Sequence, residues 1–419
     1  MHRIARAKSG HLPTLLSALL YFDVSFMVWV LLGPLAPFIG DQLHLSPAQR
    51  GLLTAIPLLG GSIFRPVLGI LGDRLGGRKA GLLGLTVTLL PLALGWFFAH
   101  QLWQFYVIGF LLGIAGASFA VALPMASKWY PPEKQGLVMG VAGAGNSGTL
   151  LATLFAPRLA QYSGYHVVFA LVAVPVLAVL LVFALCAKDS PYSAVAPTRS
   201  DYARVLREGD AWWFCFFYSL TFGGFVGLTS YLSLFFSDQY NLSHVRAGDL
   251  TTVVVVAGSF LRPVGGWFAD RLGGYRFLLL VLAAAAVCFA IISTLPSLLS
   301  AVTLLFLVMG TLGMGNGAVF QLVPLRFTRQ VGILTGIVGA AGGLGGFFIP
   351  FGLGLLRERT GSYGAGFAVY AAIFLCAGLA LLALGRRWIG TWPADRARFA
   401  AIFAVRLPVL PRKGVPAED

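Results

Sequence analysis

The chain has 419 residues, of which 58% are hydrophobic and only 11% are charged, and it carries a formal net charge of +15. A soluble globular domain has about 25% charged residues, so this composition excludes a soluble protein and predicts an all-α polytopic membrane protein. The positive charge could suggest nucleic-acid binding, but the basic residues lie mainly in loops and tails between long apolar stretches, which argues against it.

Twelve apolar stretches are long enough to cross a membrane as helices, since about 20 residues span the hydrocarbon layer. They are 14–39, 50–71, 80–98, 103–126, 136–157, 166–187, 211–237, 247–268, 277–295, 299–324, 332–355 and 363–385. A polar segment rich in Pro and Ser follows the sixth stretch, which predicts two six-helix bundles with a linker and a tail. The predicted boundaries are 1–187 for the N-terminal bundle, 188–210 for a cytoplasmic linker, 211–385 for the C-terminal bundle and 386–419 for a basic tail along the lipid surface.

Basic residues are distributed unequally between the two sides. The termini and the even-numbered loops hold 23 of the 30 Lys and Arg residues, and the odd-numbered loops hold five. Because cytoplasmic loops are enriched in Lys and Arg, this asymmetry predicts a multi-pass protein of the cell (inner) membrane with both termini in the cytoplasm.

The first span contains Asp23, the only carboxylate that we place inside a span. Intramembrane acids are rare and usually functional or paired, so Asp23 is either a proton-coupling residue or a permanent salt-bridge partner of Arg65 or another cation. Phe26 in the same span is a candidate for the substrate site, with simple packing as the alternative.

The second span is repeated in the eighth. Residues 53–79 match residues 250–276 at 13 of 27 positions without a gap, and each copy contains an arginine followed by proline, Arg65 and Arg262. An unpaired guanidinium in hydrocarbon costs roughly 3 kcal/mol on insertion scales, so two at equivalent depth suggest a functional pair. Two such bundles packed face to face would direct both arginines into one central cavity from opposite walls.

Three further spans carry candidate site residues. The fifth contains GVAGAGNSG, with Gly145 and Asn146, and the eleventh contains GAAGGLGGFFIP, with Gly342. These glycines permit close helix packing, while an amide in a glycine run can also donate to an anion. The aromatic seventh span contains Tyr218 and Phe222, spaced to share one helix face.

These motifs together resemble the nitrate/nitrite porter family of the major facilitator superfamily. The turn after the second span follows the superfamily pattern G-x-x-x-D-R-x-G-R-K/R with one extra glycine, Gly77. The AGxGNxG run, the GGLGGFxxP run and the two RP-containing spans carry the resemblance to the family. It implies the major facilitator fold, a nitrate or nitrite substrate, and a substrate site lined by Tyr218 and Phe222.

The predicted chemistry is recognition of an anion. Guanidinium groups suit small planar oxyanions through paired hydrogen bonds; nitrate, nitrite, bicarbonate and short carboxylates all fit, and the resemblance favours nitrate. Since arginine does not deprotonate, Asp23 is the candidate for carrying a proton. Its surroundings, FDVSFMVWVLLGPLAPF, resemble the proton-linked branch of the family, and this resemblance implies nitrate/proton symport, which we expect. The alternatives are nitrate/nitrite antiport, in which two unneutralised cations prevent the empty site from closing, and an anion channel. The sequence has no catalytic or metal-ligand motif, and its four cysteines have no paired spacing, so we expect a transporter without cofactors and no enzyme. We also expect a monomer.

Overall fold

The computed structural model describes residues 10–131, 138–139, 141–191, 199–327 and 331–391, and every regular element in this part of the chain is a helix. The elements are α1 (Leu12–Trp29), α2 (Leu32–Gln42), α3 (Pro47–Leu75), α4 (Gly77–Phe97), α5 (Leu102–Gly116), α6 (Phe119–Ser127), η1 (Ala144–Ser147), α8 (Gly148–Ser163), α9 (Tyr165–Cys186), α10 (Arg199–Arg207), α11 (Gly209–Tyr240), α12 (His244–Phe260), α13 (Arg262–Leu272), α14 (Gly274–Ile292), α15 (Leu298–Arg326), α16 (Val331–Thr360) and α17 (Tyr363–Thr391).

Eleven helical segments in the described residues are long and apolar enough to cross a membrane, and three of them consist of two consecutive helices. They correspond to eleven of the twelve predicted spans. The remaining span, 136–157, begins on residues that the structure does not describe, and its described part consists of residues 138–139 and 141–143, η1 and the start of α8.

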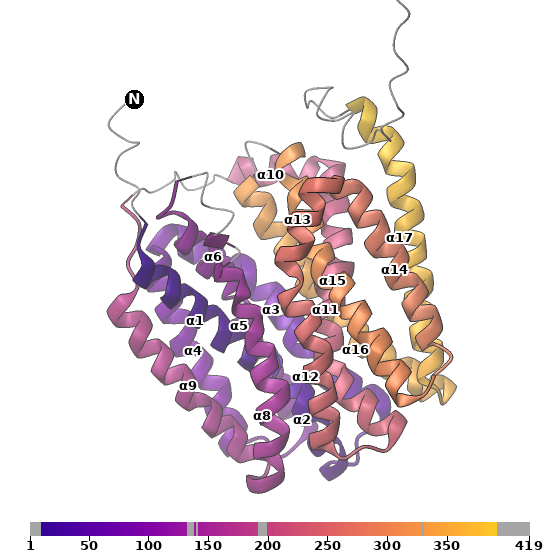
Figure 1. Cartoon of the computed structure of the whole chain (residues 1–419). Coiled ribbons are helices and arrows are strands. Elements are labelled where there is room, and N and C mark those ends of the chain that lie inside the picture. The colour runs from indigo at the N-terminus through magenta and orange to yellow at the C-terminus, as the bar shows by residue number, and fades with distance from the viewer. Residues whose placement is uncertain (1–9, 132–137, 140, 192–198, 328–330, 392–419) are drawn as a thin grey trace, which may run out of the picture.

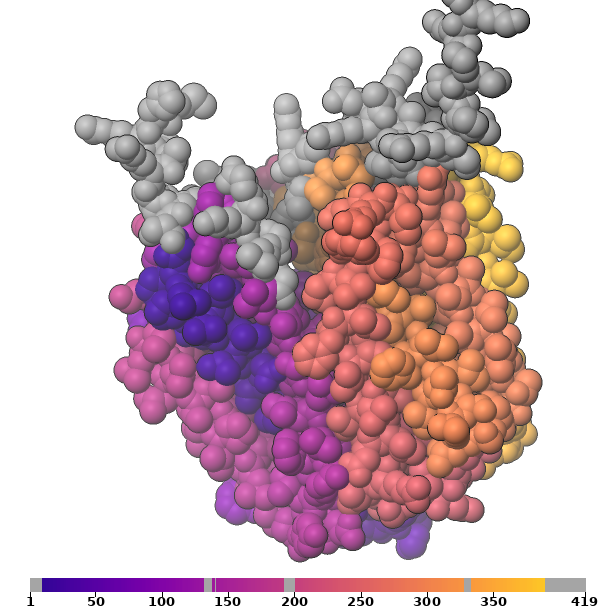
Figure 2. All heavy atoms as spheres, viewed as in Figure 1, coloured from indigo at the N-terminus to yellow at the C-terminus, as the bar shows by residue number. Residues whose placement is uncertain are grey.

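The helices form two groups that lie side by side (Figures 1 and 2). Helices α1 to α9 make up the N-terminal group and α11 to α17 the C-terminal group, and the groups meet where α3 packs on α16, α8 on α12 and α2 on α11. We call the end that carries α10 the linker end, and the end between α2 and the start of α12 the distal end; they lie at the top and bottom of Figure 1.

The repeated turns have the same backbone conformation in both groups. Gly76 connects α3 to α4 with φ of 89°, and Gly273 connects α13 to α14 with φ of 84°. Residues with a side chain are disfavoured in this left-handed region, which explains why both copies have glycine here. In the first copy, the Asp189 carboxylate accepts a hydrogen bond from the backbone N–H of Arg78 and so caps the start of α4.

Glycines also allow the repeated helices to approach each other closely. A Cβ atom on Gly113 of α5 would lie 2.3 Å from the backbone of Gly60 on α3. In the C-terminal group, a Cβ on Gly313 of α15 would lie 2.3 Å from the backbone of Gly258 on α12. The small residues in the fourth and tenth spans therefore bring each arginine-bearing helix against its neighbour, as small-residue interfaces do in membranes.

The two arginine–proline steps differ in structure. Pro66 lies inside the continuous helix α3, whereas the helix of the second copy is interrupted at Leu261, so that Arg262 and Pro263 begin α13. Proline lacks the N–H for the preceding turn, so both a kink and a break are compatible with the sequence.

The structure adds helical segments to the predicted linker and beyond the predicted end of the last span. The predicted linker contains a short helix, α10, and α11 begins at Gly209. The last helix continues past the predicted end at residue 385 to Thr391, and the basic tail that we expect on the lipid surface lies outside the described residues.

Candidate functional site

Arg65 lies on α3 between the two groups of helices and is only 2% exposed. Its Nε donates to the carbonyl of Gly116 at 3.0 Å, and its Nη1 donates to the carbonyl of Gly339 on α16. Its Nη2 is buried without a hydrogen-bond partner, and no carboxylate forms an ion pair with Arg65 in the described residues. The charge is therefore held by neutral groups from both halves and keeps a free donor.

Aromatic rings surround this guanidinium. Its Cζ lies 5.0 Å from the ring centroid of Trp29, 5.5 Å from that of Phe119 and 5.1 Å from that of Phe222. Such contacts stabilise a desolvated cation by about 2 kcal/mol each. Only Phe222 was predicted. Phe119 is a large ring in a stretch of small residues, and that contrast is the one sequence signal that distinguishes it.

The aromatic cluster continues into the C-terminal group. The Tyr218 and Phe222 rings are parallel within 1° with centroids 5.1 Å apart, and the Phe320 ring packs edge-on against Tyr218 at 4.8 Å. The Arg262 Cζ lies 6.0 Å from the Phe320 centroid. The predicted pair Tyr218 and Phe222 thus lies between the two arginines, one turn apart on α11.

The two arginines are close enough for their charges to act on each other, and both act on Tyr218. Arg262 is also a side-chain hydrogen-bond partner of Tyr218. It is only partly buried, but its Nη1 is enclosed without a hydrogen-bond partner. The site therefore contains two like charges, each with an unused donor.

Gly342 and Phe26 lie beside these rings. A Cβ atom on Gly342 would lie 2.6 Å from Cδ1 of Tyr218 and 2.9 Å from Cδ1 of Phe222, so the absence of a side chain lets α16 pack on both. Phe26 is fully buried, with its centroid 5.0 Å from that of Trp29 and 6.3 Å from that of Phe222. Phe26 therefore joins the cluster through the rings of Trp29 and Phe222.

Asn146 and Gly145 lie in η1, which packs against α1 and α12. Asn146 is 1% exposed, and neither atom of its amide has a hydrogen-bond partner. The Cβ position of Gly145 points at α1, 2.7 Å from Cδ1 of Phe22 and 2.9 Å from the backbone nitrogen of Asp23. Gly145 therefore packs η1 onto α1, while Asn146 is a buried amide without a partner.

Asp23 is linked to the same segment. Its Oδ1 accepts from the Ser147 hydroxyl at 2.6 Å, and it also accepts from the backbone N–H of Gly148, so it caps the start of α8. The described residues contain no ion pair of Asp23, and Arg65 makes its hydrogen bonds to carbonyl groups. The expected alternative of a salt bridge between Asp23 and Arg65 is absent from this conformation.

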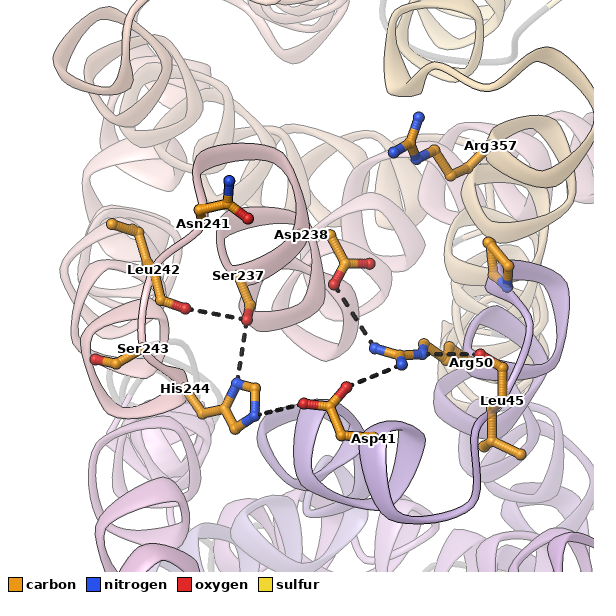
Figure 3. Close-up of a pocket in the computed structure, with 11 residues that line it drawn as sticks. Asp41, Leu45, Arg50, Ser237, Asp238, Asn241, Leu242, Ser243, His244 and Arg357 are labelled. Atoms are coloured by element: carbon orange, nitrogen blue, oxygen red, sulfur yellow. Dashed lines mark hydrogen bonds and ion pairs between the residues drawn. The ribbon is translucent and has the colours of Figure 1, made fainter.

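At the distal end, a polar network joins the two groups around a cavity of about 680 Å³ (Figure 3). Arg50 lies between two carboxylates, 2.9 Å from Asp41 of its own group and 3.6 Å from Asp238 of the other. His244 approaches Asp41 across the same boundary at 3.0 Å. Glu358 accepts hydrogen bonds from the hydroxyl of Ser46 and from the N–H of Ala48.

A second set of contacts at the distal side joins α8 to α12. Arg158 forms a 2.6 Å ion pair with Asp249, and the hydroxyls of Thr153 and Thr252 are 2.8 Å apart. The side-chain hydrogen bonds and ion pairs that Ser62, Arg65, Thr153 and Arg50 make to the other helix group lie from the middle of the molecule to the distal end. This conformation is therefore closed on the distal side.

Comparison with known proteins agrees with this architecture. A family model described as Major Facilitator Superfamily matches residues 18–350. The xylose transporter XylE from E. coli, in a partially occluded inward open conformation, superposes with a TM-score of 0.72 at 13% identity, covering 89% of this chain and 98% of that chain. This likeness concerns the fold alone and confirms the predicted all-α, two-bundle architecture of the major facilitator fold.

Two curated proteins are similar along most of their length. A nitrite extrusion protein of Bacillus subtilis is 36% identical over 357 residues, which cover 84% of this chain and 88% of that protein. A probable nitrate/nitrite transporter NarK2 of Mycobacterium tuberculosis is 36% identical over 364 residues, covering 84% of this chain and 91% of that protein. Membership of such a family makes the chain a multi-pass membrane transporter rather than an enzyme. With these matches and the motifs of its duplicated spans, the chain belongs to the nitrate/nitrite porter family of the Major Facilitator Superfamily.

Proposed function

We propose that this protein moves nitrate, nitrite or both across the membrane by alternating access, with Arg65 and Arg262 binding the anion between the two helix groups. The observation that carries the proposal is the pair of interacting guanidinium groups, each with a buried, unused donor and neither in an ion pair within the described residues. The substrate class rests on the names of the similar proteins.

The surroundings of the arginines suit a small planar oxyanion. Guanidinium donors form a rigid fork that matches two oxygens of such an anion, and they stay charged throughout the cycle. The parallel Tyr218 and Phe222 rings and the Phe119 ring limit the space available and keep water away. In a water-poor site, two positive charges attract an anion far more strongly than they would at the surface.

Lysine substitution tests the arginine clamp. Arg65→Lys and Arg262→Lys each keep the charge but lose the fork, so each should raise the Kd for nitrate by about 10- to 100-fold, measured by calorimetry on purified protein. The exposed Arg246 at the start of α12 provides the control, and Arg246→Lys should leave the Kd unchanged. Wild-type affinity in both site variants would contradict the clamp.

The distribution of charge and contacts suggests which way the protein faces. Lys and Arg gather at the linker end and in the termini, so we place this end and both termini in the cytoplasm of a cell whose inner membrane holds the protein. The distal end is then the outer end, and its ion pairs close the protein on that side. In this conformation the protein binds or releases its anion on the cytoplasmic side.

Asp23 supports coupling of nitrate uptake to protons. It has no cationic partner in the described part of the chain, and its bond to Ser147 connects it to the residue after Asn146. Protonation would weaken the cap on α8 and loosen the segment that carries the amide of Asn146, which links the proton to the anion site. We therefore favour nitrate/proton symport.

Nitrate/nitrite antiport is the second mechanism, and the two like charges of the empty site favour it, because closing around them without an anion is costly. Asp23→Asn separates the two mechanisms in proteoliposomes. Symport predicts that uptake driven by a pH gradient is lost while nitrate/nitrite exchange persists. Gradient-driven uptake at the wild-type rate would exclude the coupling role of Asp23.

A further inference from the structure

Asn316 on α15 is a second buried amide without a partner. It is 1% exposed, and neither its Nδ2 nor its Oδ1 has a hydrogen-bond partner. Among the asparagines that the structure describes, only Asn146 shares this property. Buried amides are almost always hydrogen-bonded, so an amide with both atoms unused points to a ligand that is not part of the protein.

Its position along α15 follows from the contacts with α11, which runs in the opposite direction. Three contacts set the register: Leu312 with Gly224, Gly315 with Thr221, and Phe320 with Tyr218. Asn316 lies one turn from both Leu312 and Phe320 and shares their helix face, since residues four apart lie on one side of a helix. It is therefore at the level of Phe222, whose ring contacts Arg65.

Another neighbour of this part of α15 is α13, the helix that begins with Arg262. Gly265 packs on the backbone of Met314, and Gly266 packs on Gly317, so the start of α13 lies alongside Asn316. Arg262 itself reaches the ring of Phe320 and has an unused Nη1. The two unused groups, an amide and a guanidinium nitrogen, thus lie on adjacent helices at the same depth.

We propose that Asn316 is a specificity-determining residue of the anion site, contributed by the C-terminal half as Asn146 is by the N-terminal half. In the anion-bound protein its Nδ2 donates to an oxygen of a small planar oxyanion, and its Oδ1 accepts from Nη1 of Arg262 and orients the guanidinium. A neutral amide adds a directed donor without a third charge, so it favours an anion with oxygens in a plane over a spherical one such as chloride. This inference rests on the proposed function.

Two substitutions and one control test it by calorimetry with nitrate on the purified full-length chain. Asn316→Leu removes the hydrogen bonds and keeps the size, and Asn316→Asp adds a repulsive charge. Asn316→Leu should raise the Kd for nitrate by about 10- to 100-fold, and Asn316→Asp by at least as much. The control is Ser230→Ala on α11, which also removes a buried polar group without a hydrogen-bond partner. Ser230 packs against Gly33 and lies two turns from Phe222, so this variant should keep the wild-type Kd.

Thermal unfolding of the anion-free protein separates binding from structure. Asn316→Leu should unfold at or above the wild-type temperature, because it replaces an unpaired buried amide with an apolar group. A lower unfolding temperature with an unchanged Kd would show a structural role and overturn the inference. A wild-type protein that binds neither nitrate nor nitrite would overturn the proposed function as well, whereas normal binding by Asn316→Leu would overturn this inference alone.

Discussion

Gly342 is the position where one methyl group should disturb the anion site most. A Cβ there would lie 2.6 Å from Cδ1 of Tyr218 and 2.9 Å from Cδ1 of Phe222, and these rings are stacked and fully enclosed, so one of them has to move. Overpacking of this kind costs about 1–3 kcal/mol. If the cost falls on the anion-binding conformation, Gly342→Ala raises the Kd for nitrate by about 5- to 150-fold.

The same helix supplies a matched control. Gly336 on α16 is exposed, and no atom lies within 4 Å of its Cβ position. Gly336→Ala should keep the wild-type Kd and raise helix stability by up to about 1 kcal/mol. Calorimetry with nitrate and thermal unfolding in detergent measure both variants. A wild-type Kd for Gly342→Ala would refute the view that the stacked rings are held in place by α16.

Two further predictions concern the ends of the molecule. Removing the distal ion pair with Arg158→Ala or Asp249→Ala should shift the protein toward the conformation open at the distal end. Because both side chains are 38% exposed, the shift should be no more than about 1 kcal/mol, or fivefold in population, measured by distances between spin labels across α8 and α12; an unchanged distance distribution would contradict the locking role. Gly76→Ala should destabilise the protein by about 1–2 kcal/mol in thermal unfolding, because φ is 89° at Gly76. Gly266→Ala is the control and should not destabilise it, because no atom lies near its Cβ position. Equal unfolding temperatures for the two variants would show that the turn between α3 and α4 does not require glycine.

Local sequence patterns sufficed for much of the fold. Apolar length predicts the membrane spans, and the internal repeat predicts that Arg65 and Arg262 are equivalent. The shared positive φ of Gly76 and Gly273 follows from the same repeat. These features depend on residues close in the chain or on the duplication, so one sequence is enough to find them.

The neighbours of the arginines could not be predicted in the same way. Trp29 and Phe119 contact Arg65 from two other helices. Nothing in its own segment distinguishes Trp29 from a packing aromatic, and Phe119 differs only in being a large ring among small residues. Asn316 lies in a glycine run whose sequence predicts close helix packing. Only the lack of hydrogen-bond partners for its amide in the structure distinguishes it. Such contacts depend on how distant helices are rotated against each other, which a periodic pattern leaves open.

The duplicated sequence also produces an asymmetric site, and the asymmetry bears on mechanism. Arg65 is fixed by the carbonyls of Gly116 and Gly339, and the second of these bonds crosses to the other half. Arg262 stands at a helix break, partly exposed, against Phe320 and Tyr218 of its own half. If the halves separate when the site opens, Arg65 loses a bond that Arg262 does not have. An anion can replace that carbonyl as the acceptor, so its binding competes with a contact between the halves and is thereby linked to their movement.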